Sequence, residues 1–465
     1  MNVLMVCSEL APWAKTGGLA DAVTGLGNAL VARGHDVRVL LPRYAHLPGA
    51  GVRLRRLRAG RHRFSEIETG DRAAPRIYLL ELDELTAESI YTADARDAGR
   101  FIRLAAAALE LPAALKWRPD ILHCHDWHAA LTPVLNRAAG SARVARTVLT
   151  LHNVGYQGVF AADVLEQYAP PQLRTAIAPD ALAGGDVNFL RAGVHAADIV
   201  TTVSPTYAAE IRTPQFGMGL EDVLSTRGAT LVGILNGVDY DVWDPRTDPF
   251  LTAHFDATNL APKRQLKSAL AARLGLQADA TTPVVGIVTR LAPQKGIDLV
   301  TAALPGLLRE TRATFAVLGS GDVALASVLT SIAREQPTRV AFTDGYDEAL
   351  AHLIFAAGDL TLVPSRYEPC GLTQMYALRY GTIPVVRATG GLADTIEHFD
   401  PATGTGNGSV FRDADPGGLS WGLRTALGWF DDRAVWSRLV ANAMAADFSW
   451  RNQVPHYERL YASLL

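Results

Sequence analysis

Short runs of apolar residues alternate with longer segments of helical periodicity along most of the chain. The first part carries six such runs, at residues 2–8, 36–42, 76–82, 121–126, 146–153 and 198–205. A second series follows Pro283, at residues 283–291, 313–321, 339–346, 359–365 and 383–391. Continuous apolar runs are typical of parallel strands that are buried on both faces. The pattern therefore predicts an α/β protein whose parallel sheets are covered by helices.

The pattern predicts two helices most clearly. Residues 18–34 show helical spacing and end at Gly34, a common stop signal, and residues 97–115 form a second clear helical pattern. A third helix is expected to begin near Leu372.

The chain is too long for one ordinary hydrophobic core, since it has 465 residues. The break between the two series falls at residues 237–250, which are rich in Asp and Pro. We therefore predict a first Rossmann-like domain over residues 1–240, a connector at 241–250 and a second Rossmann-like domain over 251–445. Two doubly wound sheets facing a deep interdomain cleft would place ligands beyond the carboxyl ends of the strands.

Composition narrows the functional classes. Apolar residues make up 49% of the chain and charged residues 20%, and the formal net charge is -3, so we expect neither nucleic acid nor a membrane as a partner. The arginine-rich stretch 53–63 is interpreted as an exposed strand and loop. The three cysteines are far apart and odd in number, and no apolar run approaches the roughly 18 residues that span a bilayer. We expect a cytoplasmic protein without a targeting segment.

Three turns that follow predicted strands carry residues suited to anions. Lys15 and the adjacent Gly17 and Gly18 lie between the first strand and the first helix, where free amides and a positive dipole end favour a phosphate. Arg290 and Lys295 follow the first strand of the second series, and two cations suit a departing diphosphate. Each turn alone also fits an ordinary surface loop with solvated charges.

A third turn combines an acid with a helix start. Glu368 lies in the loop before the helix expected near Leu372, so its carboxylate could accept hydrogen bonds from sugar hydroxyls while the helix amides bind phosphate. A histidine-rich stretch, HCHDWH, spans residues 123–128. Zinc is disfavoured there because His123 and His125 fall on one strand face without a supporting CxxC pair. A set of hydrogen-bonding groups around Trp127 suits a carbohydrate better.

Taken together, these motifs resemble the bacterial glycogen synthase and plant starch synthase family. The matching segments include KTGGLAD, HDWHA, HNVGYQGVF, RLAPQKGIDL and the long PSRYEPCGLTQMYALRYG block, and they run in order from residue 3 to about residue 460. The resemblance implies a retaining glucosyltransferase of the GT-B fold, in glycosyltransferase family 5. Such enzymes move glucose from a nucleotide diphosphate glucose, usually ADP-glucose, to the non-reducing end of an α-1,4-glucan. By analogy, residues 446–465 would form a helix that crosses back to the first domain.

The resemblance also implies roles for individual residues. It implies catalytic roles for Lys15, His152, Arg290, Lys295 and Glu368. The lysines and the arginine would contact the diphosphate, and Glu368 and His152 would contact the transferred glucose. Donor contacts are implied for Gly17, Gly18, Asp21, Asn236, Tyr346 (on the adenine), Leu372 and Thr373. Acceptor-side or glucose-side contacts are implied for Tyr91, Asp126, Trp127 and Asn153. No metal and no cofactor are expected.

Retention without an evident carboxylate nucleophile favours front-face attack, in which the leaving phosphate helps to deprotonate the acceptor. The alternatives are a synthase that uses UDP-glucose, a phosphorylase with a pyridoxal phosphate lysine, and a catalytically silent glucan-binding protein. One local departure from the family lies in GTGNGSVF, where Gly408–Ser409 replaces the usual Gly–Phe. Its consequence is left open.

Overall fold

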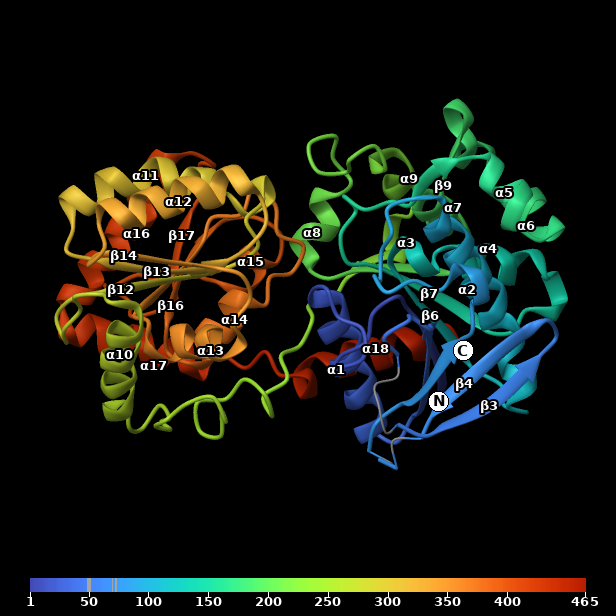
Figure 1. The fold of residues 1–465 in the computed structure, drawn as a ribbon, viewed down its shortest axis with the longest axis horizontal. Helices are drawn as coiled ribbons and strands as arrows, with labels where there is room; N and C mark the ends of the chain where they lie inside the picture. The colour runs from blue at the N-terminus through green and yellow to red at the C-terminus, as the bar shows by residue number, and fades with distance from the viewer. Residues whose placement is uncertain (48–51, 69, 72) are drawn as a thin grey trace. The chain divides into compact units, whose positions relative to one another are not determined.

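The protein divides into two compact units, which we describe separately (Figure 1). The computed structural model describes residues 1–47, 52–68, 70–71 and 73–465. Unit 1 comprises Met1–Gly237 and Trp450–Leu465, and unit 2 comprises Val238–Ser449. The last helix thus groups with the first part of the chain.

The described residues of unit 1 form a nine-stranded sheet that winds outward in both directions from its first strand. All neighbours are parallel except at one edge, where β3 and β4 form an antiparallel hairpin that pairs with β5. The strands, in spatial order, are β11 (Leu231–Gly233), β10 (Ile199–Thr202), β7 (Arg146–Leu151), β6 (Ile121–His125), β1 (Asn2–Val6), β2 (Asp36–Pro42), β5 (Arg76–Leu80), β4 (His62–Ile67) and β3 (Leu54–Ala59).

Helices cover both faces of this sheet. Alternate residues of each strand pack in opposite directions, so Leu4 and Val6 join the core under α2, α4 and α7, while Val3 and Met5 join the core under α1 and α18. The helices are α1 (Gly18–Ala32), α2 (Ala95–Ala114), α3 (Asp126–Ala129), α4 (Leu131–Ala138), α5 (Asp163–Tyr168), α6 (Pro171–Ala176), α7 (Phe189–Ala196), α8 (Pro205–Glu210), α9 (Glu221–Thr226) and α18 (Trp450–Ala462). A separate small ribbon pairs β8 (Val159–Ala161) with β9 (Asp186–Asn188).

Helix α18 docks where two glycines leave room for an aromatic ring. A Cβ atom on Gly25 of α1 would lie 1.9 Å from the indole nitrogen of Trp450, and one on Gly237 would lie 2.6 Å from the same residue. Deeper in the core, the Tyr461 hydroxyl hydrogen-bonds Nδ1 of His123 at 2.7 Å. These contacts fix the last helix on unit 1.

Unit 2 contains a six-stranded parallel sheet with the strand order of a Rossmann fold. Its first strand lies at the centre, and the next two strands and the last three lie on opposite sides of it. In spatial order the strands are β14 (Val340–Asp344), β13 (Thr314–Gly319), β12 (Val284–Val288), β15 (Leu360–Val363), β16 (Ile383–Arg387) and β17 (Ser409–Phe411). The fold class predicted from the sequence, two Rossmann-like domains, is therefore confirmed.

The helices of unit 2 again form two layers. Helices α11, α12 and α16 cover one face of the sheet, and α10 and α13 cover the other (Figure 1). The helices are α10 (Ala261–Leu274), α11 (Ile297–Glu310), α12 (Val323–Glu335), α13 (Glu348–Ala357), α14 (Thr373–Arg379), α15 (Gly390–Thr395), α16 (Pro416–Asp431) and α17 (Arg433–Ala445).

The segment expected to be a connector packs tightly within unit 2. The Trp243 ring is stacked between His352 and Tyr376, with ring centroids 3.8 and 4.0 Å away. The carboxylate of Asp248 is buried and accepts hydrogen bonds from His352 at 2.7 Å and Tyr380 at 2.5 Å. Residues 241–250 are therefore held against α13 and α14 of this unit.

The Gly408–Ser409 departure has a local packing explanation. Ser409 lies on β17, is fully buried, and donates a hydrogen bond from its hydroxyl to the carbonyl of Gly422 on α16 at 2.9 Å. The hydroxyl thus links the edge strand to α16, and this bond satisfies the buried hydroxyl.

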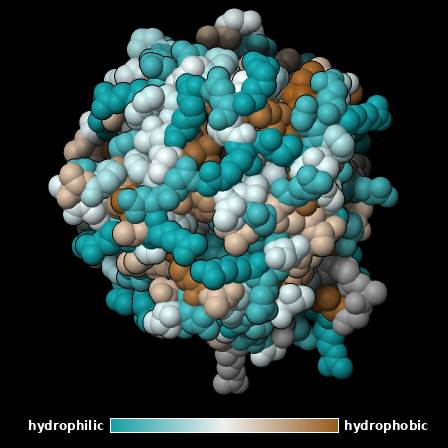
Figure 2. All heavy atoms as spheres, turned by 90° about the vertical axis from the view of Figure 1, so that its left-hand side faces the viewer, coloured by the Kyte–Doolittle hydropathy of each residue, from teal (hydrophilic) through white to brown (hydrophobic). Residues whose placement is uncertain are grey.

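Cys7, Cys124 and Cys370 are buried thiols, and in the described part of the chain none of them forms a disulfide, as expected from their spacing. None of the helices in the described part of the chain is both long and apolar enough to cross a membrane. On the face shown in Figure 2, hydrophobic residues are scattered among hydrophilic ones, as on ordinary protein surfaces.

Candidate functional site

The glycine turn after β1 is organised by Glu9, a residue that the sequence motifs did not single out. Its buried carboxylate accepts hydrogen bonds from the Thr16 amide at 2.7 Å, the Gly17 amide at 3.1 Å and the Thr16 hydroxyl at 2.7 Å. The Tyr91 hydroxyl donates to the same carboxylate at 2.5 Å. Glu9 therefore links the turn that carries Lys15 to the loop that carries Tyr91.

Two candidate donor residues on this turn form an ion pair. The Lys15 ammonium lies 2.8 Å from Asp21 Oδ1, and both side chains are partly exposed. The Gly17 amide is already used by Glu9, whereas the start of α1 at Gly18 has no side-chain cap. The amides of the first turn of α1 are thus the ones left for an anion.

At the end of β6, Asp126 holds the loop that follows β7. Asp126 adopts a left-handed backbone conformation with φ of 56°, and its carboxylate accepts a hydrogen bond from the His152 amide at 2.7 Å. The Asn153 amide is a second backbone partner of the carboxylate. Burial raises the pKa of Asp126 to about 7, although the backbone hydrogen bonds oppose that rise. This geometry brings the predicted residues Asp126, His152 and Asn153 together.

Of the histidines around this site, His123, His125 and His128 are buried and His152 is partly buried, and this environment keeps them neutral. Burial lowers the pKa of His152 and of His123 to about 3. His152 Nε2 lies 3.1 Å from Nδ1 of His125, and the His123 and His125 rings are 4.2 Å apart on one strand face, as the period of two predicted. Among the described residues, no group of three or more His, Cys, Asp or Glu side chains is arranged to hold a metal ion.

Tyr91 and Trp127, which were predicted on the acceptor or glucose side, lie among other aromatic rings. Tyr91 stacks on His128 with ring centroids 4.9 Å apart, and its hydroxyl also lies 3.0 Å from the Ser8 hydroxyl. Trp127 is nearly buried and packs edge-on against Phe101, with centroids 5.0 Å apart. Tyr91 and Trp127 are therefore both fixed near His128.

Asn236 lies just after β11, at the same carboxyl edge of the sheet. Its side chain is buried, and Oδ1 has no hydrogen-bond partner within the described part of the chain. A buried amide oxygen without a partner is costly, which suggests that a ligand or water satisfies it in the working protein.

In unit 2, the loops after β12 and β15 bring Lys295 and Glu368 together. The Lys295 ammonium lies 2.6 Å from Oε2 of Glu368, and the Ser365 hydroxyl donates to the same oxygen at 2.8 Å. Glu368 is buried, whereas Lys295 retains partial exposure. The charge of the buried acid Glu368 is therefore neutralised by Lys295, whose ammonium can also face a ligand.

Close backbone packing sets the position of these loops. Gly296 has φ of 66°, and a Cβ atom there would lie 2.2 Å from the Pro364 carbonyl. The Arg366 amide donates to the Gln294 carbonyl at 2.8 Å, and Arg366 forms a bidentate pair with Asp298 at 2.6 Å. Arg290, by contrast, is an exposed side chain on the same loop, with a contact of 3.5 Å to Gln294.

The helix start after Glu368 is also confined by glycines. The Gly391 amide donates to the Glu368 carbonyl at 3.0 Å, and a Cβ atom on Gly391 would lie 2.0 Å from the Cys370 carbonyl. Helix α14 begins at Thr373 with Leu372 as its uncapped first flanking residue. Tyr346 lies elsewhere on unit 2, after β14, with 72% of its surface exposed.

Two contributors could not be read from the sequence motifs. Glu9 and Ser365 each contact a predicted site residue, but nothing in the local pattern distinguishes them from ordinary loop residues. The closest signal was the position of Glu9, a lone acid between a buried strand and a glycine turn.

Comparison with known proteins follows the same two-unit division. Residues 2–226 match the family model of the starch synthase catalytic domain, and residues 272–437 match that of the glycosyl transferases group 1. The chain is 46% identical to a glycogen synthase of Anaeromyxobacter dehalogenans, over 100% of this chain and 99% of that one. It is 43% identical to a glycogen synthase of Rhodospirillum rubrum, over 100% of this chain and 99% of that one.

Solved structures give the same result. The catalytic domain of starch synthase IV from Arabidopsis thaliana, bound to ADP and acarbose, matches with a TM-score of 0.90 and 37% identity over 99% of both chains. A sucrose-phosphate synthase of Thermosynechococcus elongatus, with a TM-score of 0.64 and 18% identity over 100% of this chain and 98% of that one, shares the fold.

Proposed function

The chain belongs to the glycogen synthase and starch synthase family, and from this premise we propose that it transfers glucose from ADP-glucose to the non-reducing end of an α-1,4-glucan with retention of configuration. The observation that carries the proposal is the Lys295–Glu368 ion pair, at 2.6 Å, whose acid lies five residues before α14 begins at Thr373 without a side-chain cap. A cation and a sugar-binding acid from two adjoining loops, together with the amides of a helix start, suit a sugar linked to a diphosphate.

We assign the binding of the donor diphosphate to Lys15 in unit 1 and to Arg290 and Lys295 in unit 2. The amides of Leu372 and Thr373 would hold the outer phosphate, since helix starts bind anions through their free amides. Fixed cations stabilise the negative charge that gathers on a departing diphosphate.

Further donor contacts are assigned to Gly17, Gly18, Asp21, Asn236 and Tyr346, of which Tyr346 stacks on the base. The exposed ring of Tyr346 supports that role. Oδ1 of Asn236 has no hydrogen-bond partner among the described residues, which supports a hydrogen bond to the ligand. Because the Gly17 amide donates to Glu9, we assign to Gly17 the role of shaping the turn.

The glucose and acceptor side is assigned to His152, Asn153, Asp126, Trp127 and Tyr91. For the chemistry we propose front-face attack, with the leaving phosphate oxygen taking the proton of the acceptor hydroxyl. Double displacement needs a carboxylate free to attack the anomeric carbon. Asp126 is occupied by backbone amides and Glu368 by Lys295 and Ser365, which supports the front-face route.

The proposed front-face transfer requires no metal and no cofactor, because Lys15, Arg290 and Lys295 neutralise the diphosphate. The three buried thiols fit a reducing compartment such as the cytoplasm, which we propose as the site of action.

The test is nucleotide release from ADP-glucose and from UDP-glucose, each with and without glycogen. We expect ADP release that depends on glycogen, with labelled glucose retained on the polymer. Faster UDP release would overturn the donor. Release that ignores glycogen would overturn the acceptor, and binding to glycogen without any release would indicate a silent glucan-binding protein.

A further inference from the structure

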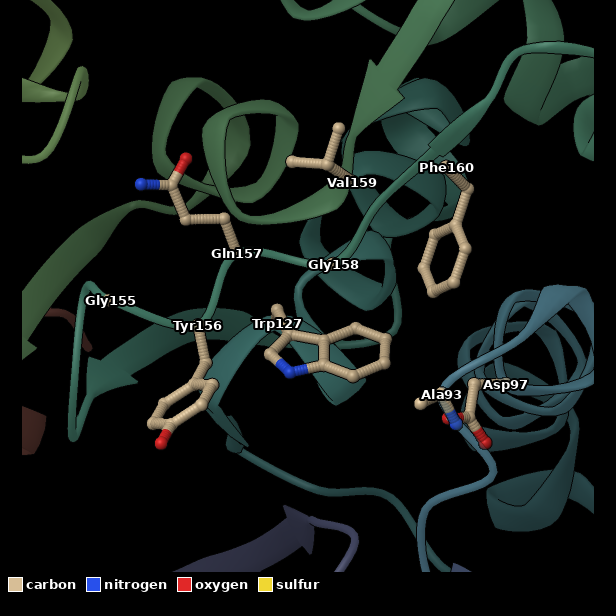
Figure 3. A pocket seen from close by; sticks show the side chains of 9 residues that line it. All are labelled: Ala93, Asp97, Trp127, Gly155, Tyr156, Gln157, Gly158, Val159 and Phe160. Atoms are coloured by element: carbon tan, nitrogen blue, oxygen red, sulfur yellow. The ribbon is translucent and has the colours of Figure 1, made fainter. Parts of the chain in front are cut away.

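Trp243 of unit 2 has no part in the proposed reaction, unlike Trp127, whose pocket belongs to the glucose and acceptor side assigned above (Figure 3). The Trp243 ring lies between residues of α13 and α14. Resting on the proposed function, we propose that Trp243 is a positioning residue for the donor nucleotide. Its ring sets the separation of the two helices that carry the base-binding and the phosphate-binding groups.

Helices α13 and α14 both lead away from groups assigned to the donor. The two helices contribute to one hydrophobic cluster of unit 2 and lie side by side (Figure 1). Tyr346, assigned to the base, lies two residues before α13 begins at Glu348. Leu372 and Thr373, whose amides are assigned to the outer phosphate, lie at the beginning of α14. The distance between the N-terminal ends of these helices must therefore match the length of the nucleotide.

The Trp243 ring contacts each helix within its first five residues. It stacks on His352 of α13 with centroids 3.8 Å apart and an interplanar angle of 8°. On its other face it stacks on Tyr376 of α14 with centroids 4.0 Å apart and an angle of 7°. Three parallel rings in van der Waals contact thus hold the two helices apart by the thickness of one indole.

Two buried carboxylates of the same segment hold the ring in place. Asp244 accepts a hydrogen bond at 2.5 Å from Arg379, the last residue of α14. Asp248 accepts one at 2.7 Å from His352 of α13. The residues on either side of Trp243 are therefore fastened to the same two helices. The separation is set before the donor arrives, which lowers the cost of binding.

The C-terminal ends of the two helices are fastened independently of Trp243. The Lys263 ammonium on α10 donates to the Ala356 carbonyl of α13 at 3.0 Å. It also donates to the carbonyl of Tyr380, the residue after α14, at 3.1 Å. Because this end is fixed, loss of the Trp243 ring changes the separation at the opposite ends, which carry the donor groups.

The expected effect is selective for a ligand that spans both helices. A ligand that joins two subsites gains affinity from the second only while their spacing matches its own length. ADP would reach both subsites, whereas adenosine needs only the Tyr346 side and pyrophosphate only the α14 side. Loss of the Trp243 ring should therefore weaken ADP and leave both fragments unchanged. General damage to unit 2 would weaken all three.

The experiment is calorimetric titration of the full chain with ADP, adenosine and inorganic pyrophosphate. We expect Trp243→Ala to raise the dissociation constant of ADP about tenfold or more, and those of adenosine and pyrophosphate by less than about twofold. Trp243→Phe, which keeps a flat ring, should restore most of the ADP affinity. If Trp243→Ala does not fold, Trp243→Leu, which keeps apolar bulk without a ring, carries the same expectation.

Trp436→Ala is the matched control. Trp436 on α17 is also partly buried in unit 2 and packs against the Phe430 ring, with centroids 5.0 Å apart. Both substitutions should lower the free energy of unfolding in urea, but only Trp243→Ala should weaken ADP selectively. In turnover, Trp243→Ala should raise the KM of ADP-glucose and leave the KM of maltohexaose unchanged.

The outcomes separate this inference from the proposed function. Unchanged ADP affinity in Trp243→Ala, or an equal loss for ADP and both fragments, would overturn the positioning role alone. The same selective loss in Trp436→Ala would also overturn it. A wild type that binds ADP but transfers no glucose would overturn the proposed function instead. A wild type that binds neither ADP nor UDP would overturn both.

Discussion

Replacement of Glu9 by alanine is the sharpest test of how the glycine turn is organised. The carboxylate accepts four hydrogen bonds, from the Thr16 amide and hydroxyl, the Gly17 amide and the Tyr91 hydroxyl. Glu9→Ala removes the two oxygens that accept all four of these bonds, from a side chain that is only 3% exposed. Because Glu9 is not assigned a substrate contact, any effect on catalysis must pass through Tyr91 or through the turn that carries Lys15 and Gly17.

The structure sets the size of the effect. A hydrogen bond to a charged group contributes about 1.5–3 kcal/mol, but Thr16 is exposed, so water can replace part of what is lost. The Tyr91 hydroxyl also keeps its contact with Ser8. We therefore expect a loss of about 2–4 kcal/mol in the free energy of unfolding. Misplacement of a positioning element by about 1 Å can cost about a hundredfold, so kcat/KM should fall about ten- to a hundredfold.

The assay combines steady-state ADP release with urea unfolding for the wild type, Glu9→Ala and Glu9→Gln. Glutamine has the same shape, and its oxygen can still accept from the two amides while its NH₂ group donates to the hydroxyls of Thr16 and Tyr91. Glu9→Gln should thus retain most of the stability and activity. Wild-type kcat/KM in Glu9→Ala, or equal losses in both variants, would refute the reasoning.

Three other predictions concern single features. Lys295→Ala should lower kcat by about two to three orders of magnitude, as for loss of one preorganised charge; a wild-type rate of ADP release would remove Lys295 from the mechanism. The free energy of unfolding in urea should fall below pH 6.5, because the pKa of His123 and of His152 is about 3 when folded, so the unfolded chain binds more protons. His152→Asn should flatten that slope, and an unchanged slope would contradict the assignment. Gly25→Ala should destabilise the protein by about 1–3 kcal/mol, since its Cβ would meet Trp450, and an unchanged Tm would contradict this docking.

Most strands of the two sheets were predictable for a physical reason. Buried parallel strands are continuous apolar runs, and all eleven predicted runs contain a strand of the two sheets. The short strands β8, β9, β11 and β17 were missed because three-residue strands carry too little periodicity to register. Of the arginine-rich stretch only one strand was predicted, whereas the structure has the β3–β4 hairpin there.

Contacts between residues far apart in the chain could not be predicted from the sequence. Tyr91 lies 82 residues from Glu9, and Tyr461 lies 338 residues from the His123 ring that it bonds. No local pattern encodes such pairs, since only the packing of the sheet and α18 creates them. Lys295 and Glu368 were both predicted as site residues from their positions after strands, but their 2.6 Å ion pair became visible only in the structure.

The central claim is tested most directly by incubation with maltohexaose and ADP-glucose labelled with carbon-13 at the anomeric position. The account predicts maltoheptaose with the label on the non-reducing end in an α-1,4 linkage, read from the carbon spectrum and the product mass. Free labelled glucose, a β-linked product or no elongation would contradict it.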